Sequence, residues 1–198
     1  MREIPKGFHI HKNGEGLVAD SAHVDESAFI DKNAQVYGNA QVYGNARVYG
    51  NARVYGNAWV SGDARVFGDA WVSGDAQVYG DAQVYGNARV YGNARVSGDA
   101  QVYGNARVYG NAWVSGDAQV YGNAWVYGNA WEQSPLYVQG SKHSITNSKH
   151  GEITIGCHSH DFKYWLKHYR AIGKANGYTK EQIAEYGKII ALVVKIGK

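Results

Sequence analysis

Small apolar side chains recur along the chain with a strict period of six residues. From Asn33 to Gly128 the sequence consists of sixteen unbroken hexapeptides, each with Ala second, Val fourth and Gly sixth. The positions flanking each Val are polar or aromatic, which predicts a short strand with Val pointing inward. Gly followed by Asn or Asp is typical of a turn, because these residues tolerate positive φ. The pattern therefore predicts a strand and a corner in every hexapeptide.

Three such strands complete one turn of a prism, so residues 18 apart stack at the strand spacing of roughly 4.8 Å. A weaker form of the pattern precedes the perfect repeats at residues 15–32, and residues 135–140 still fit it. We therefore assign residues 1–140 to a three-sided solenoid of about seven coils, with residues 1–14 as an N-terminal cap.

The hexapeptide pattern resembles the left-handed parallel β-helix of the hexapeptide-repeat proteins. The resemblance covers residues 15–140. It implies a left-handed coil, which the period alone does not indicate and which departs from the usual right-handed crossover. The expected fold is an all-β solenoid whose thin core consists of Val and Ala columns on three faces.

Residues 141–198 form a tail rich in Lys, His and Ile. Its isoleucines predict one or two strands that cap the open end of the solenoid. Ser159 or Asp161 is expected to cap a first helix, and Gly173 and Gly177 are expected to end it. The capping box at residues 179–182 opens a second helix, which completes a small α-helical hairpin. The inner stripe expected for the first helix is Phe162, Trp165, Leu166, Tyr169 and Ile172.

The order of segments in the tail adds a second resemblance. A β-helix followed by a Gly-Cys-His segment, a Trp-bearing helix and a Gly-Tyr-Thr helix is similar to uncharacterised hexapeptide-repeat proteins of phages and prophages. That resemblance implies no established activity.

The charge is distributed unevenly along the chain. The formal net charge is +3, the sixteen repeats are neutral, and the tail carries nine Lys and Arg170 against four acidic residues. Neutral repeats argue against binding to long nucleic acid. The single cysteine excludes an intramolecular disulfide, and the sequence contains neither an apolar run of membrane-spanning length nor a signal-peptide core. We expect a cytoplasmic protein, in the host cytoplasm if phage-encoded, with no membrane partner.

Outward-facing aromatic residues form columns along the predicted prism. Such columns expose more apolar surface than soluble monomers usually show. The rings could simply stack on one another as strand-favouring residues. We favour burial between subunits, because the hexapeptide-repeat resemblance implies a homotrimer packed prism to prism. The expected oligomer interface consists of Tyr49, Phe67, Tyr85, Tyr103 and Tyr121.

Other columns interleave Trp with Arg, a combination suited to small anionic ligands. Aromatic rings stack on bases, and guanidinium groups bind phosphates. The predicted ligand-binding residues are Trp59, Trp71, Arg89, Arg95, Arg107, Trp113 and Trp125.

Catalytic groups are absent from the repeats. An acyltransferase of the hexapeptide-repeat class needs a general base, usually His, yet none of the eight His lies in the sixteen hexapeptides. No catalytic residue and no cofactor is therefore expected. Cys157, His158 and His160 are of metal-ligand types, but their spacing matches no established zinc signature, so no metal is expected.

The favoured hypothesis is a non-enzymatic scaffold of phage or prophage type that binds or sequesters a partner. Its concrete version is an anti-defence sponge that sequesters a small nucleotide immune signal. One alternative is a structural virion or assembly component. The other is an acyltransferase whose site is built by the His-bearing ends of the chain.

Overall fold

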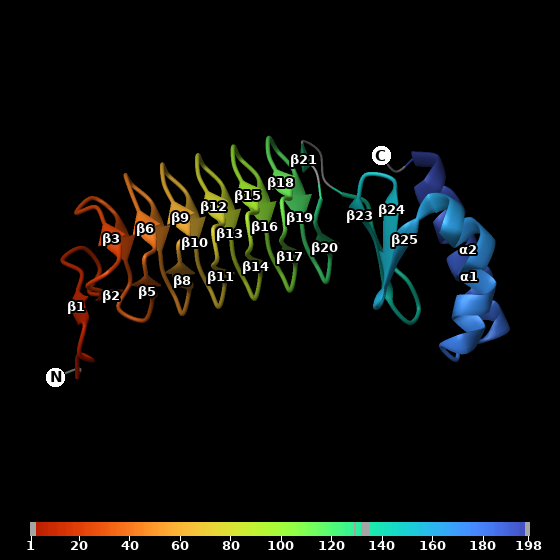
Figure 1. Ribbon diagram of the computed structural model, residues 1–198, viewed down its shortest axis with the longest axis horizontal. Coiled ribbons are helices and arrows are strands. Elements are labelled where there is room, and N and C mark those ends of the chain that lie inside the picture. Colours follow the sequence, from red (N-terminus) through yellow and green to blue (C-terminus); the bar gives the residue numbers. More distant parts are fainter. Residues whose placement is uncertain (1–2, 129, 132–134, 197–198) are drawn as a thin grey trace.

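The computed structural model describes residues 3–128, 130–131 and 135–196. The repeats wind into a three-sided solenoid whose parallel strands stack along the long axis of the molecule (Figure 1). The described residues make six complete turns and two strands of a seventh. The fold class predicted from the sequence, an all-β solenoid followed by two helices, is confirmed.

Each side of the solenoid is one sheet, and we name the three sides faces A, B and C. Face A consists of β1 (Phe8–Ile10), β2 (Leu17–Ala19), β5 (Gln35–Gly38), β8 (Arg53–Gly56), β11 (Trp71–Val72), β14 (Arg89–Val90), β17 (Arg107–Val108) and β20 (Trp125–Val126). Face B consists of β3 (His23–Val24), β6 (Gln41–Val42), β9 (Trp59–Val60), β12 (Gln77–Val78), β15 (Arg95–Val96), β18 (Trp113–Val114) and β21 (Ala130–Trp131). Face C consists of β4 (Phe29–Ile30), β7 (Arg47–Val48), β10 (Arg65–Val66), β13 (Gln83–Val84), β16 (Gln101–Val102) and β19 (Gln119–Val120).

Backbone hydrogen bonds between coils hold the ladder in register. The Trp71 amide donates to the Ala88 carbonyl at 2.9 Å, and the Ser73 amide donates to the Val90 carbonyl at 2.9 Å. The Val and Ala side chains of the repeats are buried and form one continuous core. Every outward side chain therefore lies one strand spacing, roughly 4.8 Å, from its neighbours on the same face.

The first coil is covered by the N-terminal segment. β1 pairs with β2 in the antiparallel sense, with Phe8 opposite Ala19. The buried His11 ring bridges the cap and the first coil, with its nitrogens 3.2 Å from the Asn13 carbonyl and 3.1 Å from the Asp25 carbonyl. Covering this end protects the first strands from pairing with another chain.

The other end of the solenoid adjoins a separate four-stranded antiparallel sheet. Its strands are β22 (Tyr137–Gln139), β23 (Ser144–Lys149), β24 (Glu152–Ile155) and β25 (His158–Asp161). The prediction that residues 135–140 continue the solenoid is therefore wrong, because β22 pairs with β23 and not with a coil. The register has already slipped in β21, where Trp131 lies opposite Val114, and Pro135 has no N–H to extend a ladder.

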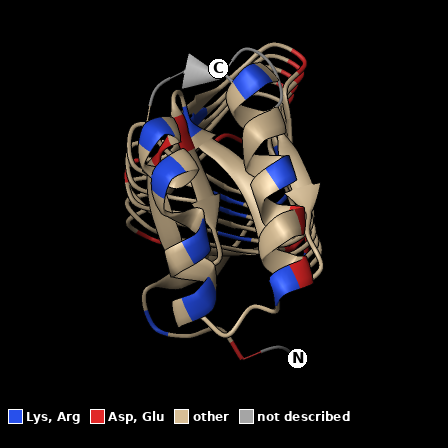
Figure 2. Ribbon diagram, turned by 90° about the vertical axis from the view of Figure 1, so that its right-hand side faces the viewer, with Lys and Arg blue, Asp and Glu red and all other residues tan. Residues whose placement is uncertain are grey.

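Two helices, α1 (Phe162–Ala175) and α2 (Lys180–Ile196), pack against each other and lie side by side across this end, and Lys and Arg occur along both (Figure 2). Asp161 is the N-cap of α1 and accepts a hydrogen bond from the Tyr164 amide at 2.7 Å. The capping box of α2 is confirmed, because the side chains and amides of Thr179 and Gln182 bond reciprocally. None of the described helices is both long enough and apolar enough to span a bilayer.

Two expectations for α1 are wrong. Gly173 lies buried inside the helix rather than ending it, because the Ile183 side chain of α2 approaches it closely. Leu166 is 47% exposed, so the inner stripe is narrower than predicted and is centred on the buried Trp165.

Candidate ligand-binding site

The seven predicted ligand-binding residues do not converge on one site. Four lie on face A, at the outward positions of β11, β14, β17 and β20, and three lie on face B, at those of β9, β15 and β18. On each face the 18-residue period places them in a single column. The face A set is Trp71, Arg89, Arg107 and Trp125, and the face B set is Trp59, Arg95 and Trp113.

The face A column is a ladder of cation–π contacts. The guanidinium carbons of Arg53 and Arg89 lie 5.5 and 4.5 Å from the centre of the Trp71 ring, on the preceding and following coils. Arg107 lies 4.9 Å from the Trp125 ring centre. Trp71 is therefore covered along the column and is not free to stack on a base. It holds two guanidinium groups in place, so that their N–H edges can bind an anion.

An open groove of about 840 Å³ runs beside this column. One wall is formed by Arg53, Trp71 and Arg89, and the other by the corner residues Asn51 and Asp69, whose side chains bond at 3.0 Å. Lys32 and Glu15 lie at its N-terminal end, so the ionised groups of the groove sum to +1. Arg53 was absent from the predicted set, although its place in the 18-residue column is a signal that would have included it.

The arginines of the repeats have no acidic partner among the described residues. In the part of the chain that the structure describes, the ion pairs involve Lys or His and none of the six repeat arginines. Arg89 and Arg107 lie opposite each other in register, as do Arg47 and Arg65 on face C. Like charges placed directly opposite destabilise a sheet. An anion bound between two such arginines would remove this repulsion.

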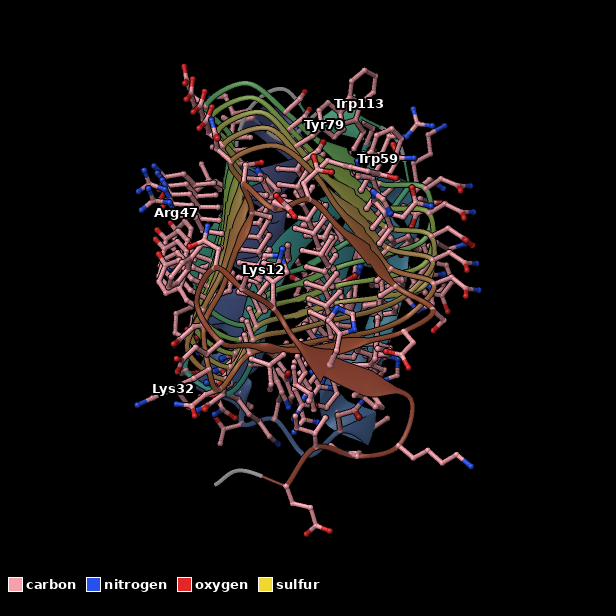
Figure 3. All side chains as sticks on the ribbon, turned by 90° about the vertical axis from the view of Figure 1, so that its left-hand side faces the viewer. Lys12, Lys32, Arg47, Trp59, Tyr79 and Trp113 are labelled. Carbon is pink, nitrogen blue, oxygen red and sulfur yellow. The ribbon has the colours of Figure 1, made fainter. Side chains whose placement is uncertain are left out.

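Two tryptophans of face B are more exposed than Trp71 on face A. Trp59 and Trp113 are 45% and 40% exposed, three coils apart, and share one side of the prism with Tyr79, whereas Arg47 lies on another side (Figure 3). The Trp113 indole N–H donates to the buried Ser97 hydroxyl at 2.9 Å. Ser97 follows Arg95 on the preceding coil, so this bond fixes the Trp113 ring against the neighbouring coil.

The aromatic column predicted as an oligomer interface is continuous. Its five rings, on face C, are stacked with centroids 4.8 to 5.5 Å apart. The pKa of Tyr85 is raised, mainly by burial and to a lesser extent by the neighbouring Tyr103. The rings therefore stack on one another within a single chain, as one of the two interpretations of the column expects. Burial of the column between subunits stays a prediction.

The side chains of metal-ligand type that the structure describes do not gather into a metal site. Within the described residues, no three His, Cys, Asp or Glu side chains lie together as a metal site requires. Cys157 is exposed, and the His158 ring is 3.2 Å from the Asn176 amide nitrogen. Burial, followed by the charge of His158, lowers the pKa of His160.

A second hollow was not predicted. It has a volume of about 260 Å³ and lies between the last coil and the antiparallel sheet, lined by residues including Trp125, His143 and Thr146. Of these only Trp125 stood in the predicted set. The sequence carries no distinct signal for this hollow, because Thr146 is one of several polar residues in β23 and Ile145 is the single apolar residue of that strand.

The fold defines this chain as a repeat β-helix protein, a parallel β-solenoid with a capped end. The family model described as the YdcK β-solenoid repeat matches six overlapping or successive segments, residues 40–56, 46–62, 58–74, 82–98, 100–116 and 118–133. No curated protein and no solved structure matches the chain significantly.

Proposed function

We propose that this protein is a non-enzymatic binding scaffold of phage or prophage type, and that face A binds a small anionic ligand of the nucleotide class. The observation that carries the proposal is the groove in which Arg53 and Arg89 are held against Trp71 without an acidic partner in the described chain. Guanidinium groups held in this way lose little freedom when they bind phosphate.

The chemistry of the groove supports binding over catalysis. Its lining contains arginine, tryptophan, amide and carboxylate side chains and no histidine among the described residues. A general base for acyl transfer would have to come from elsewhere in the chain. A ligand held without turnover is sequestered, which is the activity of a sponge for a nucleotide immune signal in the host cytoplasm. The C-terminal helices act as a cap in this proposal, and the active form is a homotrimer.

The stacked aromatic column on face C favours one other role. A rigid column of rings along the prism is a surface for packing against another copy or a virion part. A structural assembly component would use this surface and leave the arginine groove empty.

The test is calorimetric titration of the full chain with a panel of mononucleotides, linear dinucleotides and cyclic dinucleotides. We expect saturable binding by at least one nucleotide that weakens as salt is raised. Arg89→Ala should lower affinity at least tenfold, because a hydrogen bond to a charged group contributes about 1.5–3 kcal/mol. Arg170→Ala, on α1, is the matched control and should bind as the parent does.

Absence of binding across the panel would refute the nucleotide proposal. Binding that Arg89→Ala and Arg170→Ala weaken equally would place the site away from the groove. Detection of the protein in purified particles, together with absence of binding, would favour the structural role.

A further inference from the structure

The hollow between the last coil and the antiparallel sheet, which we call the junction pocket, is a partly open cavity formed by two different parts of the fold. Its volume is about 260 Å³, slightly below the range of about 300–1,000 Å³ of pockets for drug-sized ligands. Its walls are Asn123 and Trp125 from the last coil and Gln139, Lys142, His143, Ser144, Thr146, Thr154 and Gly156 from the tail.

Trp125 is the aromatic wall of the junction pocket. Its side chain is 37% exposed, and Arg107 of the preceding coil lies over one face of the ring. No residue of that preceding coil lines the pocket, so the pocket lies on the opposite side of the ring from Arg107. Unlike Trp71, Trp125 therefore has one ring face free to stack on a planar ligand.

Thr146 is the polar group that indicates a ligand. Its side chain lines the pocket although the residue is only 3% exposed, and its hydroxyl makes no hydrogen bond among the described residues. The neighbouring Thr154 hydroxyl, in contrast, lies 2.6 Å from both the Ser148 and the Ser159 hydroxyls. A buried hydroxyl without a partner is costly, and buried polar groups in proteins are almost always paired.

The remaining walls add hydrogen-bonding groups at the rim. The Tyr178 hydroxyl lies 2.6 Å from Nδ1 of His143 and fixes the orientation of that ring, which leaves Nε2 for another partner. The Lys142 ammonium is already committed, because it donates to the carbonyls of Asn176 and Gly177. The pocket therefore combines one ring face, one buried hydroxyl and a polar rim, and holds no free cation on its tail side among the described residues.

We propose that the junction pocket binds the base of a nucleoside, stacked on Trp125 and hydrogen-bonded at its edge to the Thr146 hydroxyl. A nucleobase supplies both features that the pocket lacks, a planar ring for the free face and donors or acceptors around its edge. The inference goes beyond the proposed function, because a nucleoside has no phosphate for the arginine groove. In a nucleotide bound here, the phosphates would extend past the ring edge towards Arg107.

The test uses nucleosides, which carry no phosphate. Adenosine, guanosine, cytidine and uridine are titrated into the full-length protein, with tryptophan fluorescence and calorimetry as readouts. We expect saturable binding of at least one nucleoside, insensitive to salt. Trp125→Ala should weaken binding at least tenfold, and Tyr79→Ala, an outward aromatic on face B outside the predicted ligand-binding set, is the control that should not.

Thr146→Val keeps the side-chain shape and separates ligand recognition from folding. The variant should unfold at the same temperature as the parent or higher, since it removes an unpaired buried hydroxyl, yet it should bind the nucleoside about tenfold more weakly. Failure of all four nucleosides to bind, or binding unchanged in Thr146→Val, would overturn the proposal. Binding of nucleotides alone, lost in Arg89→Ala, would overturn it while upholding the arginine groove, whereas nucleoside binding unaffected by Arg89→Ala would uphold the junction pocket alone.

Discussion

Two glycines at equivalent corners differ in one physical respect. Gly92 and Gly110 are stacked one coil apart and both have left-handed backbone, with φ of +69° and +65°. A methyl group built on Gly92 would lie 3.1 Å from the Gly110 nitrogen, whereas one built on Gly110 meets no atom within 4 Å. Substitution by Ala therefore imposes the same backbone strain at both positions. Only at Gly92 does the added methyl group also press against the neighbouring coil.

The magnitudes follow from these two contributions. Left-handed backbone costs an L-residue roughly 1–2 kcal/mol, and both variants should lose this amount of unfolding free energy. Forcing an additional carbon into a filled space typically costs about 1–3 kcal/mol more, and only Gly92→Ala should lose it. A chain of this size loses about 2–4 °C of unfolding temperature for each kcal/mol. Gly92→Ala should therefore unfold at least about 2 °C below Gly110→Ala.

The assay is thermal unfolding followed by far-ultraviolet circular dichroism, with urea unfolding as a check that the order of stabilities does not depend on the perturbant. Both variants should unfold below the parent protein. Equal losses for Gly92→Ala and Gly110→Ala would refute the reasoning, because close approach of the coils would then contribute nothing and the corner glycines would be required by φ alone.

Three further measurements test other parts of the fold. Asp161→Ala removes the N-cap that accepts from the Tyr164 amide and should cost about 1 kcal/mol of stability, measured by urea unfolding. Burial, and then a neighbouring tyrosine, raises the pKa of Tyr178 from 10.0 to about 12, so its contribution is complete below pH 10 and is lost as pH rises towards 12. Tyr178→Phe should flatten that alkaline decline in unfolding temperature, and an identical decline in the variant would contradict it. Replacing Tyr85 and Tyr103 by Ala should convert the proposed trimer to monomers in sedimentation velocity, and an intact trimer would exclude this column as the interface.

The solenoid could be predicted from sequence because its chemistry is local. Every six residues contain the inward Val, the inward Ala and the corner Gly, so one unit determines its own strand and turn, and the 18-residue period places each side chain in its column. The caps at Asp161 and Thr179 were predictable for the same reason. The position of Gly173 inside α1 was not, because it depends on the approach of Ile183 from another helix.

The candidate binding sites likewise have a part that is local in sequence and could be predicted, and a part that depends on distant elements and could not. Membership of the columns follows from the period, but the free or covered state of each ring also depends on which side chains the neighbouring strands place over it. Trp71 and Trp125 have the same place in the repeat, yet Arg53 and Arg89 both cover the first ring. Among the described residues Arg107 alone covers the second, because Trp125 lies on β20, the last strand of face A. The junction pocket brings Trp125 of the solenoid together with Thr146 of the antiparallel sheet. The hexapeptide period does not extend to that sheet and therefore could not locate the pocket.

The order of residues on face A links the two proposed sites. Along the column Trp71 separates Arg53 from Arg89, so these charges are spaced by a ring, whereas Arg89 and Arg107 are adjacent with nothing between them. The repulsion of the column is therefore greatest at this pair, and an anion gains most there. This pair lies between the groove, which extends to Arg89, and the junction pocket, whose wall is the Trp125 ring that Arg107 covers. A nucleotide with its base in the pocket and its phosphates at the arginine pair would use both sites, and it should bind more tightly than either its nucleoside or inorganic phosphate alone.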